Sequence, residues 1–445
     1  MSALKHALAG DYRVERLKPK VHFWPFILAF PIAGILILRN WTAFTRPEFW
    51  AEDGRDIFPS AMAEGVRSLI RPLSGYYMSF PRAIAYGATW FPVVWAPSIY
   101  AWVSFAFNVA ALVYFSRPGF SWIIENRIVR FGAFLLIAIW AGNGEVFFNL
   151  CNLQLSLMLL AILALLEEPH ELKPIKWLFL GLTIASTGTA LLLLPLVAWN
   201  YWKTRCWRYL SLVGLILAFL WLNSQATAAM REVAPTAFSL GKFDYRILRI
   251  VAENFLFRLL YLNFLGPDLT SKILKTAGWL FWPTSVFLFL VLVRAVRQRT
   301  PIQREALFAL LLVFVSMSSS FGLAAMGRPY LFNLVQRTSG ETFWHIHYSF
   351  YTTSLATLFW VALFAGASGF KYRRAVSAFG LLLLMRSGVF ENPSVNPRPD
   401  LNWSRTAEKI QAAVNLKRAG NLKSPVSFRN VRLHPDLGTD VTIRP

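Results

Sequence analysis

The sequence predicts an all-α polytopic membrane protein, and two observations point to this fold class. The 445 residues are 56% hydrophobic and only 15% charged, whereas soluble domains carry about 25% charged residues. The apolar residues also form continuous blocks of about 15–25 residues, which as helices can cross about 30 Å of hydrocarbon. Because the blocks do not alternate between apolar and polar residues, we expect helices and not the strands of a barrel.

The positive charge of the chain supports the same interpretation. The net charge of +22 falls mostly between the apolar blocks, as the preference of basic loops for the cytoplasmic side predicts. The sequence contains no zinc-finger spacing, phosphate-binding loop or dinucleotide fingerprint, so we expect no nucleic-acid partner. The two cysteines, Cys151 and Cys206, lie in or beside apolar blocks, which argues against a disulfide framework.

The chain begins with a basic tail, residues 1–22, which we place in the cytoplasm. The apolar block 23–38 follows and has no small-residue cleavage site after it, so we interpret it as an uncleaved signal anchor. The first loop, 39–79, then lies outside. Residues 80–95 are interpreted as a short interfacial or kinked segment, because prolines interrupt the apolar stretch here.

Further spans follow from the apolar blocks that basic or polar loops separate, and we expect about eleven spans in all. The block 177–201 is divided into two short spans that turn at Gly188, because the basic residues after it must again lie inside. The other predicted spans are 97–116, 131–142, 149–166, 209–225, 279–293, 305–325, 348–366 and 375–390.

The transmembrane domain therefore covers 23–390, and 226–278 and 326–347 are two further outer loops. The C-terminal segment 391–445 is expected to end outside as a small module that rests on the membrane domain.

Within that C-terminal module, apolar residues at helical spacing predict a helix over 403–419. The segments 426–428 and 431–433 are strand-like.

The strongest candidate site lies in the first loop, where Glu52, Asp53 and Asp56 surround Arg55 at the predicted membrane exit. A carboxylate can act as the general base on an acceptor hydroxyl, and like-charged neighbours can raise its pKa toward that task. Gly54 permits a sharp turn that directs the carboxylates inward. The alternative is a solvated loop with a helix cap.

Four arginines of the outer loops form a second candidate group: Arg71, Arg82, Arg328 and Arg337. A guanidinium group matches phosphate with two parallel hydrogen bonds. Interfacial contact with lipid headgroups is the common alternative.

Two more groups complete the set. His345 and His347 lie before the predicted span 348–366, and on an extended segment they could bind a metal ion, although an aromatic interfacial segment is the favoured interpretation.

The other group lies at the outer turn before the predicted span 149–166. Polar side chains at this turn suit either sugar hydroxyls or interhelical hydrogen bonds, and both alternatives stay open. The residues are Glu145, Asn149, Asn152 and Gln154.

Several short stretches together resemble the GT-C superfamily of membrane glycosyltransferases, and more closely a group of poorly characterised bacterial multi-pass proteins. The stretches are Trp50-Ala51-Glu52-Asp53-Gly54, Gly75-Tyr76-Tyr77, Phe80-Pro81-Arg82, Glu145-Val146-Phe147-Phe148-Asn149, Asn152-Leu153-Gln154, Ser186-Thr187-Gly188 and Leu194-Pro195.

The resemblance implies transfer of a sugar from a polyprenyl-phosphate donor to a glycan or lipid acceptor, at the periplasmic face of a bacterial inner membrane. It implies that Asp53 is the catalytic base or a metal ligand, with Glu52 as the alternative. The acidic pattern lacks Asp-x-Asp, so the resemblance does not decide whether a divalent metal ion is a cofactor. A lipid-linked-sugar flippase, a non-catalytic polysaccharide-assembly protein and an O-antigen polymerase or ligase are the alternatives.

Overall fold

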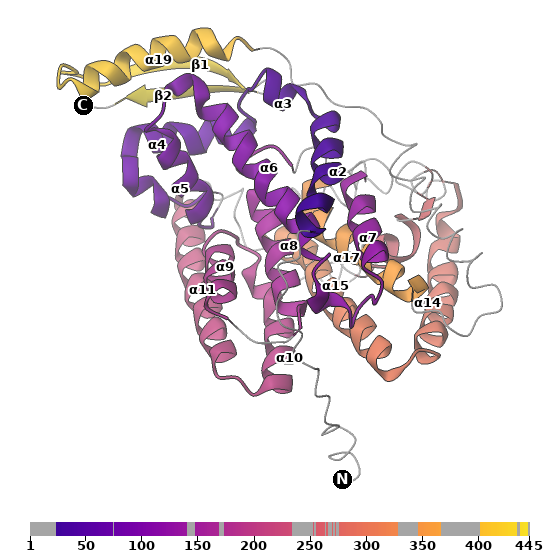
Figure 1. Ribbon diagram of the computed structural model, residues 1–445. Coiled ribbons are helices and arrows are strands. Elements are labelled where there is room, and N and C mark those ends of the chain that lie inside the picture. The colour runs from indigo at the N-terminus through magenta and orange to yellow at the C-terminus, as the bar shows by residue number, and fades with distance from the viewer. Residues whose placement is uncertain are drawn as a thin grey trace.

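The computed structural model describes the chain in separate ranges, and every structural statement below concerns these residues. In them the protein is helical apart from one two-stranded hairpin (Figure 1). The described residues are 24–73, 75–139, 147–168, 173–233, 252, 255–262, 264–265, 269, 272, 276–327, 346–365, 401–433 and 437–443.

Within the described ranges, four helical stretches are long and apolar enough to cross a membrane, which indicates a membrane-associated protein. The number of eleven spans and their orientation stay predictions. The four stretches are Val93–Tyr114, Arg208–Ala229, Gly278–Arg297 and Pro301–Ser319.

The long helices form a bundle around α8, in which every residue except Gln154 is buried. Helices α6, α9, α10 and α17 all pack against α8. The helices of the bundle are α2 (Trp24–Arg39), α6 (Ala96–Tyr114), α7 (Arg127–Ile139), α8 (Leu153–Leu166), α9 (Pro174–Ile184), α10 (Leu194–Thr204), α11 (Arg208–Val233), α14 (Phe281–Arg297), α15 (Pro301–Gly327) and α17 (Ile346–Ala365).

The block 177–201 is broken into two short helices at the predicted place, and their role as two spans stays a prediction. Helix α9 ends at Ile184, and a turn with the short helix η6 (Ala190–Leu193) leads into α10. Residues 1–22 and the predicted span 375–390 lie outside the described residues.

Two parts of the predicted outer loop 226–278 are helical in the structure. Helix α11 continues to Val233. The π-helix η7 (Phe257–Leu262) buries Leu259 and Leu260 in the core beside α17. The indole of Trp360 donates a hydrogen bond of 2.5 Å to the carbonyl of Leu259, so burial of a short apolar run draws this segment into the bundle.

The first loop is not extended but folds into short helices over one end of the bundle. After this loop, the segment 80–95 forms the short helix α5 and then η3 before α6 begins. The short helices are α3 (Thr42–Thr45), η1 (Asp53–Ile57), α4 (Phe58–Glu64), η2 (Gly65–Ile70), α5 (Ser79–Ala88) and η3 (Val93–Trp95).

The C-terminal module contains α19 (Trp403–Arg418) and an antiparallel pair, β1 (Val426–Leu433) and β2 (Leu437–Ile443). The predicted helix and strand-like segments are confirmed. Both segments fall in β1, whose pairing with β2 is irregular between Phe428 and Val431.

This module docks on the folded first loop, and the two together, residues 40–95 and 401–443, are called the cap below (Figure 1). The ring of Trp403 packs against Phe49 and Phe58, with centroids 4.6 and 5.6 Å apart. One oxygen of Glu48 accepts hydrogen bonds from the backbone N–H groups of Leu401 and Trp403. The C-terminal segment therefore rests on the first loop itself.

Candidate functional site

The acidic segment of the first loop divides into one buried and two accessible carboxylates. Asp53 is only 2% exposed, whereas about a third of the side chains of Glu52 and Asp56 is exposed. Arg55 lies between these two, with its Nε 2.8 Å from an oxygen of Asp56 and its Nη2 3.8 Å from Glu52. The π-helix η1 produces this division by turning Asp53 toward the bundle.

Asp53 fastens the cap to the bundle. Its two carboxylate oxygens accept hydrogen bonds from the backbone N–H groups of Leu150 (2.8 Å) and Cys151 (2.7 Å). These groups precede the N-terminus of α8, where the helix dipole favours a negative charge. Both oxygens are thus engaged by the chain, which suits a positioning residue better than a freely accessible base.

Arg82 is the most unusual charged residue of the cap. It is 1% exposed, and its Nη1 donates a hydrogen bond of 2.6 Å to Ser60 Oγ. Among the described residues its Nε has no partner. Burial and then the positive charge of Arg71 lower the pKa of Arg82. A buried guanidinium without a carboxylate partner is costly, and such groups are candidates for binding an anion.

The surroundings of Arg82 carry both signs of charge. Arg71 pairs with Glu64 and is half exposed. The negative charges of Asp56 and Glu64 act to raise the pKa of Arg82, whereas the positive charge of Arg71 lowers it. The hydroxyl of Ser60 accepts the hydrogen bond from Arg82 and donates one of 2.7 Å to the backbone carbonyl of Asp56. Ser60 thus links the guanidinium of Arg82 to the backbone of Asp56, and the charge of the Asp56 carboxylate interacts with Arg82 over a longer distance.

The polar residues before and within α8 have mostly local roles. The side chain of Asn149 is buried and accepts the backbone N–H of Asn152 at 2.8 Å, and the carbonyl of Asn149 accepts from Ser104 Oγ. The amide of Gln154 donates to the hydroxyl of Tyr76 at 3.0 Å. These contacts favour a role of Asn149 in hydrogen bonds within the fold over one in sugar binding. Gln154 contacts Tyr76 of the cap.

Segments far apart in the sequence meet at this end of the bundle. The backbone N–H of Phe80 donates to Ser186 Oγ at 3.0 Å. Gly188 lies so close to Tyr76 that an added Cβ would be 3.1 Å from its ring. Together with the bonds from Asp53 to the turn before α8, these contacts gather most of the short stretches on which the resemblance rests.

Some predicted site residues cannot be placed. Glu145, Arg328, Arg337 and His345 lie outside the described residues, and so does the side chain of His347, whose backbone belongs to α17. Within the described ranges, no three His, Cys, Asp or Glu side chains cluster closely enough to hold a metal ion.

Comparisons with models of protein families, with curated proteins and with solved structures give no match to this chain.

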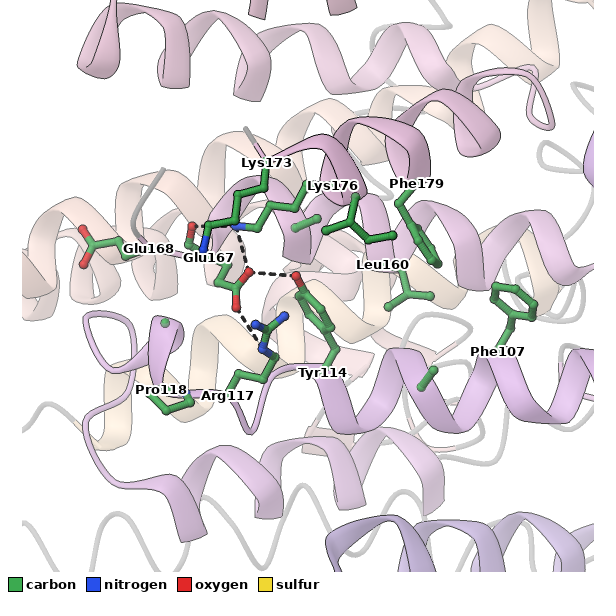
Figure 2. Close-up of a pocket in the computed structure, with 14 residues that line it drawn as sticks. Phe107, Tyr114, Arg117, Pro118, Leu160, Glu167, Glu168, Lys173, Lys176 and Phe179 are labelled. Atoms are coloured by element: carbon green, nitrogen blue, oxygen red, sulfur yellow. Dashed lines mark hydrogen bonds and ion pairs between the residues drawn. The ribbon is translucent and has the colours of Figure 1, made fainter. Parts of the chain in front are cut away.

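A second polar group, which the sequence analysis did not single out, lies at the opposite end of α8. A cavity of about 490 Å³ opens here between α6, α8 and α9. The buried carboxylate of Glu167 meets the Tyr114 hydroxyl at 2.8 Å, Arg117 Nε at 3.1 Å and Lys176 Nζ at 2.8 Å (Figure 2). The feature of the sequence that could have indicated this site is Glu167 itself, a carboxylate directly after an apolar block.

Proposed function

We propose that the protein is a membrane glycosyltransferase that moves a sugar from a polyprenyl-phosphate-linked donor to an envelope glycan or lipid acceptor. The observation that carries the proposal is Arg82, a buried guanidinium without a carboxylate partner among the described residues, whose charge interacts with that of the accessible Asp56. A cation and a carboxylate in the same part of the cap are the two groups that such a transfer needs.

Arg82 binds the phosphate that leaves from the sugar. Its planar donors match phosphate oxygens, and a site shielded from water strengthens their interaction with the developing negative charge. The cost of keeping the guanidinium buried is offset when the anion is bound. Arg71 lies near enough to add positive charge to the same region.

Asp56 or Glu52 takes the proton of the acceptor hydroxyl, because these are the accessible carboxylates. The hydroxyl oxygen then bonds to the anomeric carbon, the bond from that carbon to the phosphate oxygen breaks, and the configuration inverts. Asp53 positions the segment through the turn at Leu150 and Cys151. This assignment moves the base from Asp53 to its exposed neighbours.

The cap faces the periplasm of a bacterial inner membrane in this proposal. The basic N-terminal tail and the basic short loops at the other end of the bundle support that orientation. The spans would supply a groove for the polyprenyl chain.

The test is the glycan profile of cells. A deletion strain is complemented with the wild type, Arg82→Gln, Asp56→Asn, Glu52→Gln or Asp53→Asn, and surface glycans and lipid-linked sugars are analysed by mass spectrometry at equal protein levels in the membrane. We expect Arg82→Gln and at least one of Asp56→Asn and Glu52→Gln to lose a sugar substituent and accumulate its lipid-linked donor.

The matched control is Glu408→Gln, an exposed carboxylate of α19 on the same cap. It should keep the wild-type profile. If deletion removes the substituent but all four site variants restore it, the protein acts as an assembly scaffold. Accumulation of the donor only on the cytoplasmic side would instead show a flippase.

A further inference from the structure

We propose that the cavity between α6, α8 and α9, at the end of the bundle away from the cap, binds an anionic phospholipid of the surrounding membrane. This proposal does not depend on the proposed glycosyl transfer. The cavity volume of about 490 Å³ lies within the range of about 300–1,000 Å³ that is usual for ligand pockets. Its shape and its charges together select the ligand.

One end of the cavity is apolar. Helices α6 and α9 each pack against α8, and the cavity lies between them. Phe107 of α6 and Phe179 of α9 approach to 6.2 Å between ring centroids and close this end. Leu160 and Ala164 of α8 form the floor. The surroundings suit a hydrocarbon chain, whose burial there is favourable.

The other end carries charge, and Figure 2 shows the charged side chains away from Phe107 and Phe179. The lining includes three cations, Arg117, Lys173 and Lys176, against the carboxylates of Glu167 and Glu168. Glu167 alone engages both Arg117 and Lys176. Among the described lining residues the cations exceed the carboxylates by one, and the cations keep donors beyond those bonds. This end therefore favours an anionic group.

The charged end is a built part of the fold and not a set of loose side chains. The backbone N–H of Glu168 donates to the carbonyl of Gly119 at 2.9 Å. A Cβ at Gly119 would collide with Glu167 and Glu168, so the loop after α6 lies tightly against the end of α8. This contact holds Glu167 in place, and Glu167 in turn holds Arg117 and Lys176 beside the apolar end of the cavity.

The phosphate of a membrane phospholipid fits both ends at once. Basic residues near a membrane surface attract anionic lipid headgroups. The segments that carry these cations, 117–130 and 167–176, are the ones that the charge distribution places on the cytoplasmic side, where anionic lipids are common.

The experiment is native mass spectrometry of the full chain in detergent, titrated with phosphatidylglycerol, phosphatidylcholine or inorganic phosphate. Lys173→Gln/Lys176→Gln removes charge from the cavity mouth. Ala110→Trp fills the cavity, because Ala110 is an exposed lining residue that can be enlarged without repacking the core. Ala110→Ser and Arg294→Gln/Arg297→Gln, at exposed cations of α14, are the matched controls.

We expect one equivalent of phosphatidylglycerol to bind the wild type about tenfold more tightly than phosphatidylcholine. The lysine double variant should lose this preference, Ala110→Trp should lose the bound lipid, and both controls should behave as wild type. Equal binding by Ala110→Trp and wild type would overturn the proposal. So would displacement of the lipid by an equal concentration of inorganic phosphate, since that result would identify a soluble anion as the ligand.

Discussion

Asp53 satisfies two backbone donors that would otherwise be buried without partners. Its oxygens accept the N–H groups of Leu150 and Cys151, and the side chain is nearly inaccessible. A buried donor that loses its partner costs about 1–3 kcal/mol. Since the bonds join the first loop to the turn before α8, this one carboxylate links the cap to the bundle.

We expect Asp53→Ala to lower the free energy of unfolding by about 3 kcal/mol, because two donors are left without partners. Asp53→Asn keeps one acceptor oxygen and should lose about half as much. The measurement is denaturant unfolding in detergent micelles, followed by tryptophan fluorescence. Asp56→Ala is the control, since an exposed ion pair contributes about 0–1 kcal/mol. Equal destabilisation by Asp53→Ala and Asp56→Ala would refute this role.

The two cysteines should differ in reactivity. The thiol of Cys151 is buried, whereas that of Cys206 is partly exposed. Since the thiolate is the reactive form, Cys151 should remain unlabelled by a maleimide at neutral pH, where partly exposed Cys206 reacts.

Peptide mapping after timed labelling of the native protein measures both rates. Labelling of Cys151 should become faster as pH rises, because the thiolate fraction grows, and faster still in Asp53→Ala. Equal rates at both cysteines in the native wild type would show that the turn before α8 is open.

At the scale of elements, the cap is held by contacts between the first loop and the C-terminal module. Glu48 receives two backbone donors at the start of α19. The side chain of Gln411 accepts the backbone N–H of Val93 at 2.7 Å, and Arg418 donates to the carbonyl of Thr89. Because α19 and the hairpin are too small to form a large core alone, docking on the first loop keeps them folded.

Glu48→Ala should therefore release the module. Loss of bonds to a charged acceptor is worth about 2 kcal/mol, so the undocked population should rise more than tenfold. Limited trypsin digestion reports this population, because cleavage of a transiently open segment follows its equilibrium. Cleavage after Arg405 and Lys409 should become correspondingly faster, whereas Glu408→Ala, an exposed change on the same helix, should digest as wild type. An unchanged rate in Glu48→Ala would show that other contacts suffice.

At the scale of the molecule, local patterns predicted the helices well. The continuous apolar blocks predicted the bounds of α2, α6, α8, α14 and α15 to within a few residues. The break at Gly188 was predicted because the basic residues after the block 177–201 were placed on the cytoplasmic side. The C-terminal helix was predicted by its apolar spacing. Each of these features depends on neighbouring residues.

Long-range contacts were beyond such patterns. The partner of Asp53 is a turn almost a hundred residues away, and the burial of Leu259 depends on packing with Trp360. A short apolar run does not reveal whether it will enter a core, which is why 226–278 was interpreted as a loop. The cavity at Glu167 joins the ends of three helices, and no single stretch contains its signal.

The central claim is that buried Arg82 binds the phosphate of a polyprenyl-linked donor. Its most direct test is the affinity of the purified full chain for a polyprenyl phosphate, compared with the same polyprenol without phosphate. Ala110→Trp is present throughout, so that the cavity at the other end does not contribute. Arg82→Gln removes the charge, Arg82→Lys keeps it, and Arg405→Gln is an exposed control on the cap.

We expect the phosphate form to bind more tightly than the alcohol, and Arg82→Gln to weaken it about 10- to 100-fold, since hydrogen bonds to charged groups contribute about 1.5–3 kcal/mol. Arg82→Lys should retain part of the affinity, and Arg405→Gln all of it. If folded Arg82→Gln binds the polyprenyl phosphate as tightly as its parent, the assignment of Arg82 is contradicted.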